Sequence, residues 1–116
     1  MNPIKIKITV GNQFFIATLE DNKSALAFKK TLPISINMIE LNGNEKYGEL
    51  THLLPTLSKN PGKIEIGDLM LFGDQTLVLF YKSFNTSYAY TKIAKIDAPE
   101  LLYEAIGKGN VNIKIE

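Results

Sequence analysis

Two apolar runs separated by a glycine dominate the middle of the chain, in the stretch IEIGDLMLFGDQTLVLFYKSF at residues 64–84. Gly73 and Asp74 form a turn signal between the runs 69–72 and 77–81, which predicts a β-hairpin. Successive side chains of a strand point to opposite faces of a sheet, and here nearly all of them are apolar. Both faces of this hairpin therefore need shelter from water, one in the protein core and the other beneath a covering segment.

Alternating apolar and polar residues predict further strands on both sides of this hairpin. Such a period of two residues is typical of half-buried strands. It occurs at residues 4–10, 13–19, 34–38, 93–96 and 111–115. The dipeptide Gly11-Asn12 separates the first two of these segments, which predicts that they form a second hairpin on a tight turn.

Two segments carry helix signals. The first is expected to begin after a cap at Asp21 or Asn22 and to end at Pro33. The second follows Asp97 as its cap, has a proline close to its start, and is expected to end in a left-handed conformation at Gly107. Each segment has apolar residues at helical spacing, so each helix should pack one face on the strands.

The first and last predicted strands, IKIKITV and VNIKIE, have matching one-sided patterns. In an open sheet they would be exposed edges, which favour aggregation. Closing the sheet into a barrel removes both edges, and the two helices can then cover the ends of the barrel. A chain of 116 residues without repeats or linkers fits one domain. We therefore predict a mainly β fold in which a single domain, residues 1–116, forms a β-barrel capped by two α-helices.

Composition argues against several classes of function. The chain has thirteen lysines, no arginine and a net charge of +1, so it has no general attraction to nucleic acid or to anionic membranes. The absence of cysteine excludes disulfides, thiolate nucleophiles and sulfur-bound metals. No apolar run reaches the roughly 20 residues of a membrane span, and the N-terminus lacks the apolar core of a signal peptide. We therefore expect a cytoplasmic protein with no nucleic-acid or membrane partner; the sequence leaves the oligomeric state open.

The stretch NMIELNGNEKYGEL at residues 37–50 begins as a strand and then becomes polar. Gly43 and the asparagines beside it tolerate positive φ and predict a sharp turn. We expect residues 42–54 to leave the sheet and to lie as a lid over the second apolar face of the central hairpin, with Tyr47 and Leu50 turned inward. A helix over that face is an alternative, and an open binding groove is another.

This polar excursion would place amide, carboxylate and phenol groups beside an apolar wall, which is the usual composition of a pocket for a small molecule or a peptide segment. Turn formation alone also accounts for the same residues. The candidate ligand-binding residues are Met38, Asn44, Glu45, Tyr47, His52, Phe72 and Phe80. Together they predict a non-catalytic binding module.

No arrangement of residues typical of catalysis is evident. His52 is the only histidine, and a lone loop histidine is usually a surface residue. No serine stands in a nucleophile elbow, and no second histidine or cysteine stands at metal-ligand spacing. The interleaved aromatic and hydroxyl residues of 83–92 favour an edge loop whose tyrosines rest on the barrel. We expect no catalytic residue, no metal and no cofactor.

The order of these segments resembles a family of small bacterial cyclophilin-like proteins of unknown function. The similarity covers nearly the whole chain, and its most specific parts are ELNGNEKYGEL at residues 40–50 and the stretch 67–84. The resemblance implies a closed eight-stranded β-barrel capped by two helices, like that of the peptidyl-prolyl isomerases called cyclophilins.

The same resemblance suggests two alternative functions. The first is a degenerate or unconventional peptidyl-prolyl cis-trans isomerase, which we disfavour because cyclophilin enzymes use an arginine, a tryptophan and FHR and QGGD motifs that this chain lacks. Rotation about an X-Pro amide has a barrier of about 20 kcal/mol, and a positioned donor is needed to lower it. The second is an accessory partner of a flavodoxin-like redox protein, since relatives of this type are often linked with such proteins. The sequence has no glycine-rich loop for a flavin phosphate.

Overall fold

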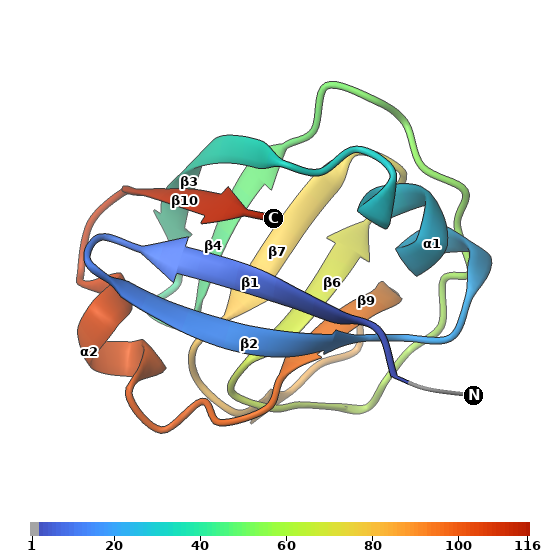
Figure 1. Ribbon diagram of the computed structural model, residues 1–116. Helices are drawn as coiled ribbons and strands as arrows, with labels where there is room; N and C mark the ends of the chain where they lie inside the picture. Colours follow the sequence, from blue (N-terminus) through green and yellow to red (C-terminus); the bar gives the residue numbers. More distant parts are fainter. Residues whose placement is uncertain (1–2) are drawn as a thin grey trace.

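The computed structural model describes residues 3–116, and Figure 1 shows how the elements are arranged. Within these residues the strands are β1 (Lys5–Val10), β2 (Gln13–Leu19), β3 (Ile34–Leu41), β4 (Glu45–Glu49), β5 (Lys63–Ile64), β6 (Asp68–Phe72), β7 (Thr76–Phe80), β8 (Phe84–Asn85), β9 (Thr91–Ile96) and β10 (Val111–Ile115). The helices are α1 (Lys23–Lys29) and α2 (Leu102–Ile106). In the described part of the chain, neither helix has the length and apolar character needed to cross a membrane.

Eight of the described strands close into an antiparallel barrel. Their order is β1-β10-β3-β4-β7-β6-β9-β2, and β2 pairs again with β1. The first and last strands are neighbours, with Ile8 opposite Ile115 and Val10 opposite Ile113. The predicted closure through the two ends of the chain is therefore confirmed, as is the mainly β character. The remaining strands, β5 and β8, form a separate two-stranded sheet.

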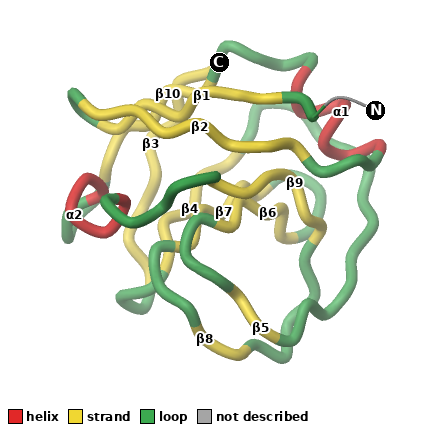
Figure 2. The backbone as a smooth tube through the Cα atoms, turned by 60° about the horizontal axis from the view of Figure 1, so that its bottom comes forward, coloured by secondary structure: helices red, strands yellow, loops and turns green. Residues whose placement is uncertain are grey.

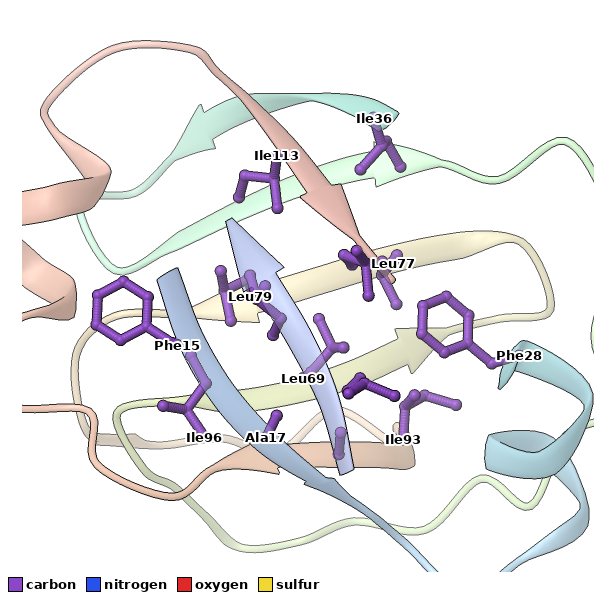
Figure 3. Packing of buried hydrophobic residues seen from close by; sticks show 14 of the residues in the cluster. Phe15, Ala17, Phe28, Ile36, Leu69, Leu77, Leu79, Ile93, Ile96 and Ile113 are labelled. Atoms are coloured by element: carbon purple, nitrogen blue, oxygen red, sulfur yellow. The ribbon is translucent and has the colours of Figure 1, made fainter. Parts of the chain in front are cut away.

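Inward-facing side chains from the strands fill the barrel. Leu69 of β6, Leu77 and Leu79 of β7, and Ile113 of β10 are almost completely buried, and Figure 3 shows them converging on one another. Phe28 of α1 joins the same cluster. Burying a side chain of this size stabilises the fold by about 1.5–3 kcal/mol, so this interior cluster is the main source of stability.

Both helices contribute buried side chains to this core, Phe28 from α1 and Ile106 from α2. Asn22, one of the two predicted caps, begins α1: its Oδ1 accepts a hydrogen bond of 2.8 Å from the backbone N of Ala25. The helix ends at Lys29, and a turn at residues 30–31 separates it from Pro33, which was predicted to end it.

The predicted capping role of Asp97 in α2 is wrong. Its carboxylate instead accepts hydrogen bonds from Thr18 Oγ1 at 2.6 Å and from Lys5 Nζ at 2.9 Å, which hold the pKa of Asp97 below its usual value. These partners come from β2 and β1, so the local pattern could not reveal them. Helix α2 begins only at Leu102 and has no side-chain cap. Gly107 follows it at a φ of 71°, a positive value that favours glycine.

The central hairpin, β6 and β7, buries both faces as predicted, except that Phe72 at the end of β6 is 47% exposed. Its inward-facing leucines belong to the barrel core, while Met70, Val78 and Phe80 face outward. These three side chains are buried in a second apolar cluster with Ile64 and Tyr90. Figure 2 shows the segments that carry β5 and β8 on the outer side of the strands β4, β7 and β6, and Ile64 and Phe84 from these segments pack on the second cluster.

The predicted lid at residues 42–54 is wrong. Residues 42–44 form only a tight turn, with φ values of 58° at Asn42 and 68° at Gly43, and the chain then re-enters the barrel as β4. Leu50 is buried in the barrel core and not on the second apolar face, whereas Tyr47 points out of the barrel and packs, partly buried, against the second apolar cluster. The outer face of the hairpin is covered instead by the chain around β5 and β8.

Lys46 explains why β4 reads as a loop in the sequence. Its side chain occupies an inward-facing position and is 0% exposed, although charged residues are rarely buried. Its Nζ donates to Glu40 Oε1 at 2.9 Å and to the carbonyl oxygens of Gly107 at 3.0 Å and Gly109 at 2.6 Å. The Tyr81 hydroxyl also donates to Glu40 Oε1, at 2.7 Å. All three ammonium donors are therefore used.

Candidate functional site

A groove of about 540 Å³ lies on the outer face of the barrel, between β4, the hairpin β6–β7 and residues 84–90. Sites for small molecules commonly have volumes of roughly 300–1,000 Å³. The lining residues come from the end of β3, the turn after it, β4, β6, β7, β8 and the loop before β9. They are Leu41, Asn42, Asn44, Glu45, Tyr47, Glu49, Phe72, Thr76, Val78, Phe84, Asn85, Thr86, Ser87, Tyr88 and Tyr90.

The alternation of β4 determines which of its side chains reach the groove. Glu45, Tyr47 and Glu49 point outward and line it, whereas Lys46 and Gly48 occupy inward-facing positions. The inner side has little room for a side chain at Gly48, since a Cβ there would lie 2.8 Å from the side chain of Ile36. The strand therefore presents two carboxylates and a phenol on one face.

A continuous row of aromatic rings forms the floor and one wall of the groove. Ring centroids are 6.3 Å apart between Tyr88 and Phe72 and 5.6 Å between Phe72 and Tyr90. The row continues below the surface from Tyr90 to Phe80 at 5.5 Å and from Phe80 to Phe84 at 5.6 Å. Tyr88 is 64% and Phe72 47% exposed, so both offer apolar surface to a ligand, while the buried rings hold them in place.

Two hydrogen-bond acceptors in the groove have no donor. Glu45 is only 9% exposed, and no hydrogen bond or cation among residues 3–116 lowers its pKa, which is raised by burial and then by the charge of Glu40. The adjacent Asn44 has a buried Oδ1 that lacks a hydrogen-bond partner in the described part of the chain. A buried acceptor such as Asn44 Oδ1 is normally paired, and the adjacent Glu45 carboxylate has no donor among residues 3–116 either, so this part of the groove suits a ligand that donates hydrogen bonds.

The remaining charges of the groove are also acidic. Glu49 accepts a hydrogen bond of 2.7 Å from Thr76 Oγ1, and none of the described lining residues is basic. Burial raises the pKa of Tyr90, and the charge of Glu45 raises it further. Within residues 3–116, no group of three or more histidine, aspartate and glutamate side chains is placed to hold a metal ion. The groove therefore combines an aromatic floor with a negative rim.

Four of the seven candidate residues come together in this groove. Asn44, Glu45, Tyr47 and Phe72 line it, and Phe80 supports its floor from below, in contact with Tyr90. Asn44, Glu45 and Tyr47 were predicted to belong to a lid over the two phenylalanines, whereas in the structure they belong to the barrel wall and the turn before it.

The other two candidates lie elsewhere. Met38 is completely buried in the barrel interior, opposite Val111 on β10, because it occupies an inward-facing position of β3. His52 lines a separate cavity of about 170 Å³, and its Nδ1 lies 3.0 Å from Thr51 Oγ1. The structure thus does not bring Met38 or His52 to the groove.

Three residues with prominent places in the groove are absent from the sequence-based set: Glu49, Tyr88 and Tyr90. The signal for the two tyrosines was visible, since aromatic and hydroxyl residues alternate in 83–92. This pattern predicted tyrosines resting on the barrel, which is correct for Tyr90, but it did not indicate which strands they would face. Glu49 could be placed in the groove only once residues 45–49 were known to form the strand β4.

Comparison with known proteins identifies the family. A sequence model described as the cyclophilin-like family matches residues 8–116, which include every residue that lines the groove. No curated protein matches the chain. Since the match spans nearly the whole length, the chain belongs to the cyclophilin-like family.

Proposed function

We propose that this protein is a non-catalytic cyclophilin-like module that binds a small molecule or a peptide segment in the outer groove. The single observation that carries the proposal is the pair of acceptors without donors, on Asn44 and Glu45, beside a row of exposed aromatic rings. In this proposal the chain acts as one domain, and α1 and α2 close the ends of the barrel.

Affinity would come from the aromatic rings and orientation from the polar groups. Phe72 and Tyr88 offer apolar surface to a ligand, and the buried rings of Phe80 and Tyr90 prevent that surface from collapsing. Burying apolar area contributes about 25 cal/mol per Å², and a few well-placed polar groups are enough to orient a ligand in such a site. The barrel provides a rigid support for both.

A peptidyl-prolyl isomerase is the second candidate, because the chain belongs to the cyclophilin-like family. The described lining of the groove has no lysine or arginine, so a donor to the proline amide would have to be a side-chain amide or a hydroxyl. A protease-coupled assay with a proline-containing peptide tests this candidate. A rate equal to the uncatalysed isomerisation removes it, and a faster rate that is lost in Asn44→Ala supports it.

A fragment screen followed by amide chemical shifts tests the binding proposal. A library of small aromatic amines, amides, alcohols and acids is added to uniformly ¹⁵N-labelled protein. Binding fragments should shift the amides of residues 44–49 and 84–90 together, while the amide of His52 in the separate cavity stays in place. Shifts that cluster only outside the groove would contradict the proposal.

A pair of tyrosine variants provides the matched control. Tyr88→Ala removes an exposed ring of the groove, and Tyr103→Ala removes a similarly exposed ring on α2, outside it. Fragments that bind in the groove should lose affinity in Tyr88→Ala and keep it in Tyr103→Ala. Equal effects of the two substitutions would show that the ring at position 88 is not part of the binding site.

A further inference from the structure

We propose that the groove selects small organic cations, in which an apolar or aromatic body carries a positively charged group with N–H donors, and that Glu45 is the counter-ion. This inference deepens the proposed function and rests on it. The ligand class is a molecule with an ammonium or amidinium group, of a size that the groove can enclose.

The charges around the groove favour a cation. Glu45 and Glu49 are both on its rim, and no basic residue among the described ones lines it, although the chain as a whole has a net charge of +1. Lys46 follows Glu45 directly in the chain, but its three donors point into the barrel, to Glu40 and to the loop after α2. It is therefore not available to an anion in the groove, and a carboxylate or phosphate ligand would meet only like charge.

The free acceptors require several donors close together. The carboxylate of Glu45 and the Oδ1 of Asn44 belong to adjacent residues at the start of β4, and neither receives a hydrogen bond within residues 3–116. The backbone there is fixed, since the carbonyl oxygen of Asn44 accepts a hydrogen bond of 3.0 Å from the backbone N of Tyr81. An ammonium group has three donors and an amidinium group has four, so either one has enough donors for both acceptors. A neutral alcohol has only one donor.

The aromatic rings complement a cation as well. A positive charge within about 6 Å of the face of a tyrosine or phenylalanine ring is attracted by the negative face of the ring. Phe72 and Tyr88 are the exposed rings, and both line the same groove as Glu45 and Tyr90. A ligand that pairs with Glu45 in this groove therefore has these rings available to it.

The size of the groove favours a small molecule over a peptide segment as the source of the cation. A volume of about 540 Å³ matches a compound of one or two rings. The acceptors belong to two consecutive residues at the start of β4, next to the turn at residues 42–44, so the ligand needs donors at one end only.

Three compounds that share one ring separate charge from shape. Benzamidine is a cation, benzamide is neutral and benzoate is an anion, and each is titrated into ¹⁵N-labelled protein. Benzamidine should shift the amides of 44–49 and 84–90 and bind roughly tenfold more tightly than benzamide, and benzoate should leave these amides unchanged. Glu45→Gln should abolish the difference between benzamidine and benzamide, whereas Glu104→Gln on exposed α2 surface should preserve it.

Asn44→Ala supplies a second variant, because it removes the other free acceptor without leaving a new unpaired group. It should also weaken benzamidine binding. Benzamide binding as tightly as benzamidine, or a benzamidine preference that survives both variants, would overturn the inference and leave the groove as a binding site. If the fragments of the wider screen bind in the groove but benzamidine does not, the inference alone fails. If no compound of either set shifts these amides, the proposed function fails with it.

Discussion

Replacing Lys46 by methionine tests how β4, which carries three of the groove residues, is held in the barrel. Methionine has a similar length and no charge, so Lys46→Met removes the donors with little change in volume. In the wild type, Nζ donates to the Glu40 carboxylate and to the carbonyl oxygens of Gly107 and Gly109. The variant leaves these three acceptors without that donor.

The expected loss follows from these bonds. Breaking a buried ion pair by removing one partner costs about 3–5 kcal/mol. Glu40 is 24% exposed and keeps donors from Tyr81 and from the backbone N of Gly43, so part of its charge remains solvated and bonded. We therefore expect the free energy of unfolding to fall by about 3 kcal/mol, a large part of the roughly 5–15 kcal/mol typical of a small domain.

Urea unfolding at neutral pH, followed by far-UV circular dichroism and tyrosine fluorescence, measures this change. Lys95→Met is the control, since Lys95 also pairs with carboxylates, on Glu65 at 2.7 Å and Asp68 at 3.8 Å, but its side chain is 47% exposed. Its removal should change stability far less, because exposed ion pairs contribute little. If Lys46→Met were no more destabilising than Lys95→Met, the buried role assigned to Lys46 would be wrong.

Three further substitutions give independent tests. Phe80→Ala should lower the free energy of unfolding by about 3–5 kcal/mol, because it removes a buried ring from the second apolar cluster. If Phe80→Ala lowered it by less than Tyr103→Ala, which removes an exposed ring, this packing would be contradicted. Gly48→Ala should cost about 1–3 kcal/mol in urea unfolding, since its Cβ would lie 2.8 Å from the Ile36 side chain; a neutral effect would show that the barrel yields there. Hydrogen bonds from Thr18 and then Lys5 lower the pKa of Asp97 in the folded state. The ionised Asp97 therefore stabilises the fold at neutral pH, and this stabilisation is lost as the pH falls from the unfolded pKa of about 3.9 through the lower folded pKa. The stability gap between the wild type and Asp97→Asn should therefore narrow between pH 6 and pH 2, and a constant gap would refute the assignment.

The barrel could be predicted from the sequence because its main determinants are periodic. The apolar runs 69–72 and 77–81 predicted a hairpin with two buried faces, and the structure confirms it. The matching end segments predicted closure, and Ile8 opposite Ile115 confirms that as well. Both inferences depend on the alternation of side chains along a strand, which is a local property.

The sequence could not show that residues 45–49 form a strand and not part of a lid, because this depends on interactions with residues far along the chain. A lysine at an inward-facing position breaks the strand pattern of β4, and Lys46 is accommodated there by the Glu40 carboxylate together with the carbonyl oxygens of Gly107 and Gly109. The two glycines follow α2, far along the chain. Asp97 is a second case: the residues around it in the sequence predicted a helix cap, but its carboxylate binds Lys5 on β1 and Thr18 on β2 instead.

The candidate site was predicted in part for a related reason. Asn44, Glu45 and Tyr47 were recognised as polar groups next to an apolar wall, and they do line the groove. Met38 was included because its segment reads as a strand beside that wall, but the register of β3 turns it into the barrel. The segment that forms the opposite wall, residues 84–90, reaches the groove only through tertiary packing.

Residues 84–90 fold over the outer face of β6 and β7, and both the second apolar cluster and the groove require this arrangement. Nuclear Overhauser effects between aromatic protons test this arrangement without a ligand. Contacts from the ring of Tyr90 to the rings of both Phe72 and Phe80 are predicted, because the centroids lie 5.6 Å and 5.5 Å apart. A spectrum in which Phe72 and Phe80 show contacts only within their own hairpin, and none to Tyr90, would contradict the account.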